Sequence, residues 1–152
     1  IQHLTSLVDR RKQVPSPGEH PNGVLRTDRV YIAVENVAQA AKAYSQVFGL
    51  PVPRLQHGNV IKADMAVFDI GATGIAVAQP LEDGPAAESL ARRGPGPFQA
   101  LFRTTSMGAA AKWMQDHGIP PPARGVRDTG EHAMLVPPSE ARGASIGSVG
   151  PE

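Results

Sequence analysis

A chain of 152 residues is long enough for one ordinary domain that buries most of its apolar surface, so neither a metal nor a disulfide is needed for folding. Cysteine is absent, which excludes disulfides, thiolate catalysis and structural Cys-zinc sites. The net charge is +1, and the basic clusters Arg10-Arg11-Lys12 and Arg92-Arg93 are too small for a nucleic-acid-binding face. The sequence shows neither a long apolar run nor a signal-peptide pattern, so we expect a cytoplasmic protein that does not bind a membrane.

Residues 1–23 are expected to form an N-terminal arm. Apolar residues near its start fall on roughly one side of a helix, and the turn-rich sequence QVPSPGEHPNG follows them. We expect the arm to dock on the domain or on a second subunit, and disorder explains the same pattern nearly as well.

Residues 28–54 return as a second copy at residues 98–124. When Arg29 is set against Gln99, Ala40-Ala41-Lys42 aligns with Ala110-Ala111-Lys112, and one deletion then aligns the two Gly-x-Pro motifs that follow. Two unrelated amphipathic helices would also give part of this pattern, but duplication explains the matched starts and ends better.

Each copy predicts a strand followed by a helix. Asn36 and Ser106 are suited to cap the helix N-termini through their side-chain oxygens. Apolar residues then recur at helical spacing, and Gly49 and Gly118 predict left-handed C-caps.

The remaining segments complete each copy as βαβββ. Residues 60–70 and 73–79 predict a hairpin, and a connection at 81–97 has a short helix near residues 86–93. The second copy predicts a strand at 98–104, a helix at 107–117, a loop at 120–130, and strands at 131–136 and 144–149. The prediction is an α+β fold with two tandem modules, at 24–80 and 98–149, and a tail at 150–152.

Several motifs resemble the vicinal oxygen chelate superfamily, which includes glyoxalase I, methylmalonyl-CoA epimerase, extradiol dioxygenases and bleomycin-resistance proteins. The resemblance covers about residues 24–149 and is closest to the epimerases, through DRVYIAVENV, FGL, TGIAVAQPL, LARRGPGPFQALF and VPPSEARGASIGSV. It implies curled sheets that enclose a shared cavity, a small-molecule substrate or ligand, and a homodimer.

The four metal-ligand positions of these relatives fall on Arg29, Ala76, Gln99 and Gly147. None carries an imidazole or a carboxylate, so we expect neither a metal nor another cofactor. A permanent cation at Arg29 could instead hold an anion or an enolate oxygen. The alternative is that Arg29 turns to solvent and apolar side chains fill the cavity.

Strand alternation from Arg29 places Tyr31 and Ala33 in the cavity and packs Val30, Ile32 and Val34 under a helix. The same register in the second module directs Gln99 and Leu101 inward. We predict substrate-binding roles for these cavity residues and for an apolar residue on the third strand of each module, which gives the set Tyr31, Gln99, Leu101, Phe68 and Met134.

Asp64 and His132 occupy equivalent positions in the third strands, and the resemblance places a general base near Asp64. Facing each other across an apolar cavity, they could move a proton on and off carbon, while Arg29 stabilises the oxyanion. Each could equally lie in solvent at the start of its strand.

The sequence thus predicts a metal-independent isomerase or lyase that acts on a small carbonyl or acyl-thioester substrate. One alternative is a binding or sequestering protein of the drug-resistance type, although aromatic residues for its walls are few. Another is a domain that has lost its ligand and serves subunit association.

Overall fold

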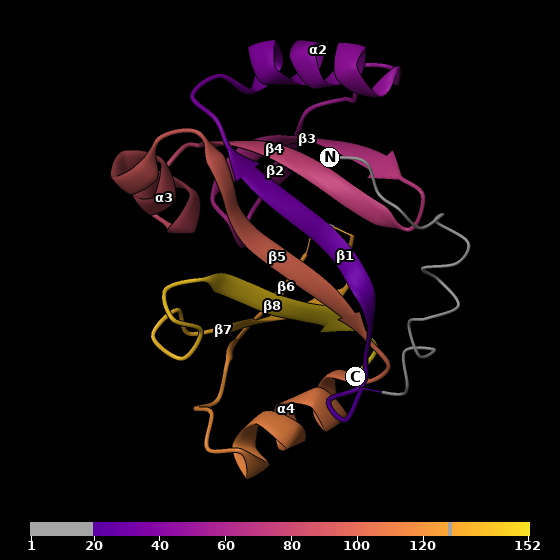
Figure 1. Ribbon diagram of the computed structural model, residues 1–152, viewed down its shortest axis with the longest axis vertical. Coiled ribbons are helices and arrows are strands. Elements are labelled where there is room, and N and C mark those ends of the chain that lie inside the picture. The colour runs from indigo at the N-terminus through magenta and orange to yellow at the C-terminus, as the bar shows by residue number, and fades with distance from the viewer. Residues whose placement is uncertain (1–19, 128) are drawn as a thin grey trace, which may run out of the picture.

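The computed structural model of the protein describes residues 20–127 and 129–152, so most of the expected N-terminal arm lies outside the described residues. One eight-stranded sheet runs through the molecule in the order β2-β3-β4-β1-β5-β8-β7-β6 (Figure 1). None of the helices in the described ranges is long and apolar enough to cross a bilayer. The α+β class and the βαβββ arrangement are confirmed.

The first module contains β1 (Val24–Ala33), α2 (Val37–Phe48), β2 (Gln56–Gly58), β3 (Ala63–Ile70) and β4 (Thr73–Pro80). The connection contains α3 (Pro85–Arg93). The second module contains β5 (Gly96–Thr104), α4 (Met107–Asp116), β6 (Ala123–Val126), β7 (His132–Val136) and β8 (Ser145–Gly150). The prediction of a loop at 120–130 is wrong at residues 123–126, which form β6. This edge strand is short and exposed, and it has no alternating apolar pattern that would predict a strand.

The predicted helix ends are confirmed. The side chains of Asn36 and Ser106 each accept a hydrogen bond from the backbone N–H three residues further on, at 2.9 and 3.2 Å. Gly49 and Gly118 have φ angles of 66° and 74°, in the left-handed region that glycine adopts without a steric cost.

The strand register makes the two modules equivalent about a pseudo-twofold axis. Antiparallel pairing of β1 with β5 sets Arg29 opposite Leu101 and Tyr31 opposite Gln99. Within each module the first strand pairs in parallel with the last, Tyr31 with Ala76 and Leu101 with Gly147. The pairings relate Arg29 to Gln99, Tyr31 to Leu101 and Ala76 to Gly147, as the aligned copies predict.

Two helix-facing cores lie on the outer side of the curled sheet. Under α2, Ile32, Ala66, Phe68 and Val77 pack against the helix, and under α4 Met134 packs against Met107 and Met114. Alternate strand residues point to opposite faces, so the remaining apolar positions form a third core on the inner face.

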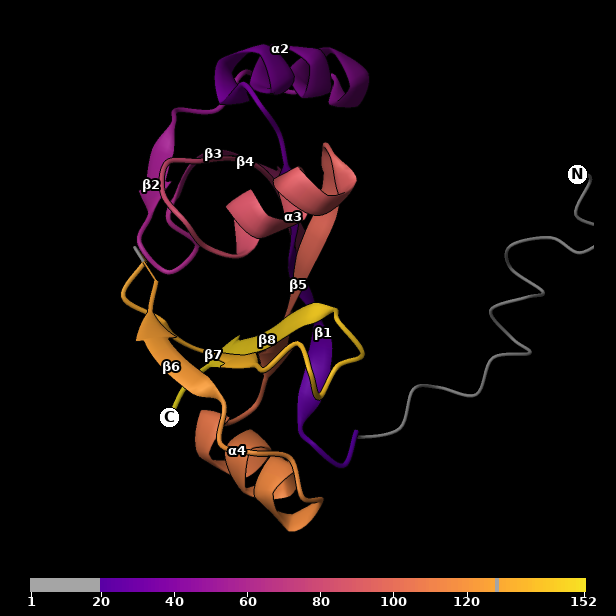
Figure 2. The ribbon, with the colours of Figure 1, turned by 90° about the vertical axis from the view of Figure 1, so that its left-hand side faces the viewer.

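The inner core joins the modules. It contains Tyr31 and Ala33 of β1, Met65 of β3 and Leu101 of β5, and α3 packs against it through Ala86 and Leu90. Figure 2 shows the two halves of the sheet curling toward each other on the side where β2 and β6 lie. There a Cβ built at Gly125 would lie 3.3 Å from Val60, so the arms touch.

Candidate anion-binding site

A cleft that is open to solvent lies where the two arms of the sheet meet. Side chains from both modules line it: Arg29, Tyr31, Gln56, residues 58–61, Met65, Arg127 and Thr129. Strand alternation positions Arg29 and Tyr31 on the inner face of β1, as predicted. The walls combine hydrocarbon with two arginines, a composition typical of sites for small polar ligands.

Arg29 is the unusual group of the cleft. Its Nε is buried and has no hydrogen-bond partner, and its Cζ lies 6.0 Å from the centre of the Tyr31 ring. A Cβ built at Gly74, its neighbour on β4, would lie 3.1 Å from this Nε. A buried donor without an acceptor costs free energy, so the arrangement favours a ligand oxygen at Arg29.

The equivalent place in the second module is closed. Gln99 is 3% exposed, and its Oε1 accepts a hydrogen bond from Ser145 Oγ at 3.1 Å. Leu101 lies in the inner core, as predicted. Gln99 and Leu101 therefore share the inner face of the sheet with Arg29 and Tyr31 but do not line the cleft.

Asp64 and His132 are equivalent in register, as predicted, but they do not face each other across the cavity. Asp64 alternates with Ala63 and Met65, which belong to the inner core, so it lies on the outer face. There Asp64 Oδ1 is 3.2 Å from His57 Nδ1, and the Asp64 side chain is 40% exposed.

His132 lies on the outer face for the same reason, because the next residue, Ala133, belongs to the inner core. Its Nδ1 is 3.2 Å from an oxygen of Glu152, and its side chain is 52% exposed. The alternative reading, in which both groups lie near solvent, is the correct one.

The expected cavity positions of Phe68 and Met134 are also wrong. Phe68 packs edge-on against Phe48 at 5.6 Å between ring centres, inside the core under α2. Met134 is fully buried in the core under α4. Both strands are apolar on each face, which is why the sequence left their orientation open.

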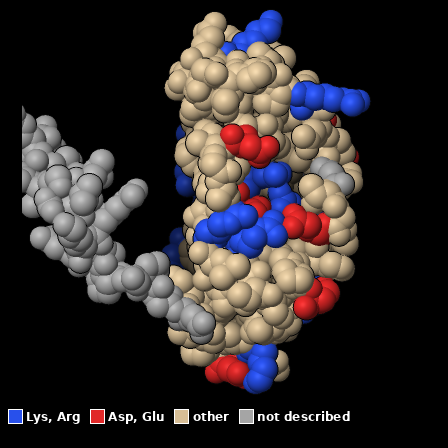
Figure 3. All heavy atoms as spheres, turned by 90° about the vertical axis from the view of Figure 1, so that its right-hand side faces the viewer, with Lys and Arg blue, Asp and Glu red and all other residues tan. Residues whose placement is uncertain are grey.

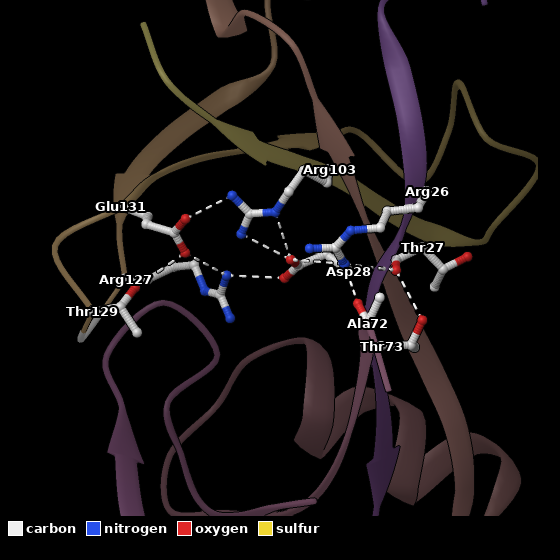
Figure 4. A network of polar contacts seen from close by, with 9 residues as sticks. All are labelled: Arg26, Thr27, Asp28, Ala72, Thr73, Arg103, Arg127, Thr129 and Glu131. Carbon is white, nitrogen blue, oxygen red and sulfur yellow. Dashed lines mark hydrogen bonds and ion pairs between the residues drawn. The ribbon is translucent and has the colours of Figure 1, made fainter. Parts of the chain in front are cut away.

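A network of arginines and carboxylates lies beside the cleft and joins the two modules (Figure 4). Buried Asp28 accepts hydrogen bonds from Arg103, whose Nε lies at 2.9 Å, and from Arg127 at 3.1 Å. Glu131 binds the same two arginines, at 2.8 and 3.1 Å. Arg26 lies 3.7 Å from Asp28 and donates to the Ala72 carbonyl in the β3–β4 turn. On the surface shown in Figure 3, basic side chains gather in the middle of one face with acidic ones among them.

The network shifts the acidity of its members. Burial acts to raise the pKa of Asp28, but the hydrogen bond from Arg103 and the charges of Arg127, Arg103 and Arg29 outweigh it and lower the pKa. The hydrogen bond from Arg103 lowers the pKa of Glu131, and the same bond raises the pKa of Arg103. All three groups are therefore held in their charged forms.

Sequence reasoning missed Asp28 and Arg127. Asp28 lies at a β-bulge, since Thr27 pairs with Phe102 while Arg29 pairs with the preceding residue of β5. Simple alternation fails at such a point. Arg127 lies in the expected loop, and only the charge complementarity of Arg127 and Glu131, four residues apart, could have indicated that the segment is ordered.

The four positions that hold metal in the resembled family do not offer a divalent cation suitable ligands in this chain. They carry a guanidinium, an amide, a methyl group and a hydrogen atom. At Gly147 a Cβ would lie 2.6 Å from Leu101, Leu135 and the Met134 carbonyl oxygen, so two leucine side chains and the backbone occupy the place of a ligand side chain. Over the described residues, no three His, Cys, Asp or Glu side chains lie close enough to share an ion.

Comparison with known proteins places the sequence in a family. Residues 28–136 match the sequence pattern of the Glyoxalase/Bleomycin resistance protein/Dioxygenase superfamily. No curated protein sequence matches the chain at a meaningful level.

Several solved structures share the fold. Methylmalonyl-CoA epimerase from Mycobacterium tuberculosis superimposes with a TM-score of 0.78 and 20% identity, covering 93% of this chain and 95% of its own. A variant of the Streptomyces coelicolor methylmalonyl-CoA epimerase, in complex with 2-nitronate-propionyl-CoA, gives 0.72 and 22%, covering 84% and 98%. A hypothetical protein from Bacillus halodurans C-125 gives 0.67 and 20%, covering 84% and 94%. At these identities the likeness shows the fold.

Proposed function

Because the chain belongs to the glyoxalase/bleomycin resistance/dioxygenase superfamily, we propose that it binds a small organic acid or its thioester at Arg29 and acts on it as an isomerase-type enzyme. The observation that carries the proposal is the buried, unpartnered Nε of Arg29 in a cleft between the modules. An oxygen anion is the chemical group that would satisfy it.

The lining of the cleft supports a short acyl ligand. Val60, Ile61 and Met65 give the cleft an apolar side next to its two arginines. Tyr31 is the one aromatic residue among the described side chains of the lining, which does not suit a large planar drug.

The chemistry would depend on Arg29 and Tyr31. Removing a proton from the carbon next to a carbonyl puts negative charge on the carbonyl oxygen, and the Arg29 guanidinium would stabilise that charge. Apart from two arginines, Tyr31 is the titratable side chain among the described residues that line the cleft. In its phenolate form Tyr31 would accept the proton from the α-carbon and return it from the resulting hydroxyl, since arginine does not release a proton in proteins.

This reaction would proceed without a metal. The proposal rests on the donor set at Arg29, Ala76, Gln99 and Gly147, which lacks imidazole and carboxylate groups. A rate that is unchanged after dialysis against EDTA is the expected result, and a rate restored only by added divalent ions would contradict it.

Two measurements on one set of variants test the function. Methylmalonyl-CoA, the ligand named for a structural neighbour, and free methylmalonate would be titrated calorimetrically, and loss of the α-proton in D₂O would be followed by NMR. We expect Arg29→Gln to weaken binding about tenfold or more, since a charge-assisted hydrogen bond is lost. Tyr31→Phe should bind normally and lose proton exchange by about a hundredfold.

The control is Arg92→Gln, because Arg92 is an exposed arginine of α3 away from the cleft. It should match the wild type in both assays. Binding by Arg29→Gln equal to that of the wild type would overturn the placement of the site.

Ligand binding without turnover is the second candidate. The outward positions of Asp64 and His132 favour binding without turnover, because neither side chain lies in the cleft where it could exchange a proton with the ligand. Apart from the arginines, this leaves Tyr31 as the proton carrier among the described side chains that line the cleft. Tight binding with no α-proton exchange in the wild type would support this function over catalysis. Homodimer formation and a cytoplasmic location stay predictions.

A further inference from the structure

We propose that Arg127 is a second ligand-binding cation of the cleft and that it makes the site select small dianions over monoanions. This rests on the proposed function, because it assigns a substrate class to the same cleft. Arg127 comes from the β6–β7 connection of the second module, whereas Arg29 comes from β1 of the first. The ligand would therefore be held by both halves of the duplicated fold.

The first support is the bonding of the Arg127 guanidinium. Its side chain is 8% exposed, and one terminal nitrogen donates to both Asp28 and Glu131, each at 3.1 Å. The other terminal nitrogen is buried and has no hydrogen-bond partner. Figure 4 shows this nitrogen turned away from both carboxylates. A cation that is anchored on one side and unpartnered on the other is suited to a ligand oxygen.

The second support is the charge around the cleft. Among the described residues, four arginines (Arg26, Arg29, Arg103 and Arg127) surround two carboxylates, Asp28 and Glu131. Among these six described groups, the positive charges exceed the negative charges by two. The cleft lies beside them, and a ligand with two acidic oxygens, such as a short dicarboxylate, would neutralise the excess, whereas a monocarboxylate would leave one charge uncompensated.

Asp28 has a positioning role in this arrangement. It is buried at a β-bulge and holds Arg103 and Arg127 at once, so it fixes the direction in which Arg127 presents its free N–H groups. Glu131 and the Thr129 hydroxyl, 3.3 Å from it, complete the support from the loop. Asp28 itself does not line the cleft.

The test compares malonate with propionate, a dianion and a monoanion of similar size, by calorimetry at constant ionic strength. We expect the wild type to bind malonate about tenfold or more tightly than propionate, since one additional charge-assisted hydrogen bond forms. Arg127→Gln should lower malonate affinity to that of propionate and leave propionate binding unchanged. Arg29→Gln should weaken both anions, and the exposed control Arg92→Gln should weaken neither.

Arg127→Lys is a second variant that tests the role of Arg127 if Arg127→Gln misfolds. It keeps a positive charge beside Asp28 and Glu131 but lacks the forked donors of arginine, so it should fold and still lose most of the preference. A malonate preference that survives in both Arg127 variants would overturn the role of Arg127 and leave the Arg29 site standing. Failure of the wild type to bind either anion would overturn the proposed site as well.

Discussion

The Arg29 guanidinium lies against the bare backbone of Gly74, where a Cβ would come within 3.1 Å of Nε. The equivalent pair in the second module is Gln99 and Ser145, whose side chains are hydrogen-bonded to each other. One module thus has a cation with a free donor where the other has a closed polar pair. Since the backbones are equivalent, the side chains at these positions account for the difference.

Gly74→Ser should therefore weaken anion binding without unfolding the protein. The new hydroxyl would accept a hydrogen bond from Arg29 and compete with the ligand, and a loss of about tenfold or less is expected for a neutral acceptor. Calorimetric titration with malonate measures it. Gly108→Ala, in α4 where a Cβ would make an ordinary van der Waals contact with Ser106 Oγ at 3.7 Å, should bind normally and gain about 0.5–1 kcal/mol in stability. Unchanged affinity in Gly74→Ser would show that Arg29 does not hold the anion.

Asp28→Asn should lower the free energy of unfolding by about 2–4 kcal/mol, because two arginines lose the charge of a buried carboxylate that both contact. Urea unfolding followed by circular dichroism measures the change. Lys112→Gln breaks an exposed pair with Asp116 on α4 and should cost less than about 0.5 kcal/mol. Equal effects in the two variants would contradict a structural role for the network.

Acid should destabilise the protein partly through Asp28 and Glu131. Both have a pKa below the ordinary values of 3.8 and 4.5, so each stabilises the fold above those values and loses its contribution as pH falls through the lower, folded-state pKa. Unfolding free energies should be compared at intervals from neutral pH into this acidic range. An Asp28→Asn, Glu131→Gln double variant should show a shallower decline, and a parallel decline would contradict the assignment.

Gly147→Ala should be strongly destabilising, by about 1–3 kcal/mol or more, because its Cβ would lie 2.6 Å from Leu101 and Leu135 and from a backbone oxygen that cannot move easily. The measurement is again urea unfolding, with Gly108→Ala as the matched glycine. A small effect would mean that the strands around β8 relax, and that a metal-ligand side chain could be introduced there.

Asp64→Asn and His132→Ala should leave anion binding and proton exchange unchanged. Both side chains lie on the outer face, paired with His57 and Glu152 near solvent. Stability should change by less than about 1 kcal/mol, as for other exposed pairs. Loss of exchange in either variant, with the fold intact, would return these residues to the reaction.

Much of the fold could be predicted because its signals are local. The helix starts were predicted from the capping residues Asn36 and Ser106, and the helix ends from the repeated Gly-x-Pro motif. Alternation from Arg29 correctly separated the two faces of β1. The duplication in the sequence relates Arg29 to Gln99, and the strand pairing shows the same relation.

The site was harder to predict because its parts depend on tertiary structure. Residues 65–68 are apolar on both faces of β3, so alternation alone does not say which face is inside, and Asp64 was assigned to the wrong one. The bulge at Asp28 changes the register of β1 against β5, and Arg127 reaches the cleft only because the arms of the sheet meet. Neither feature has a signature in a short stretch of sequence.

The antiparallel contact between β1 and β5 has a consequence for half-length chains. A fragment with one module would leave this strand as an unpaired edge, with its hydrogen-bonding groups free along one side. A second copy of the same fragment could pair with it about a true twofold axis, in the register that Arg29 and Gln99 now share within one chain. Each copy would then bring its own Arg29 to the shared centre, so such a homodimer would have two identical sites, whereas the full chain has one cation at Arg29 and a closed polar pair at Gln99 and Ser145.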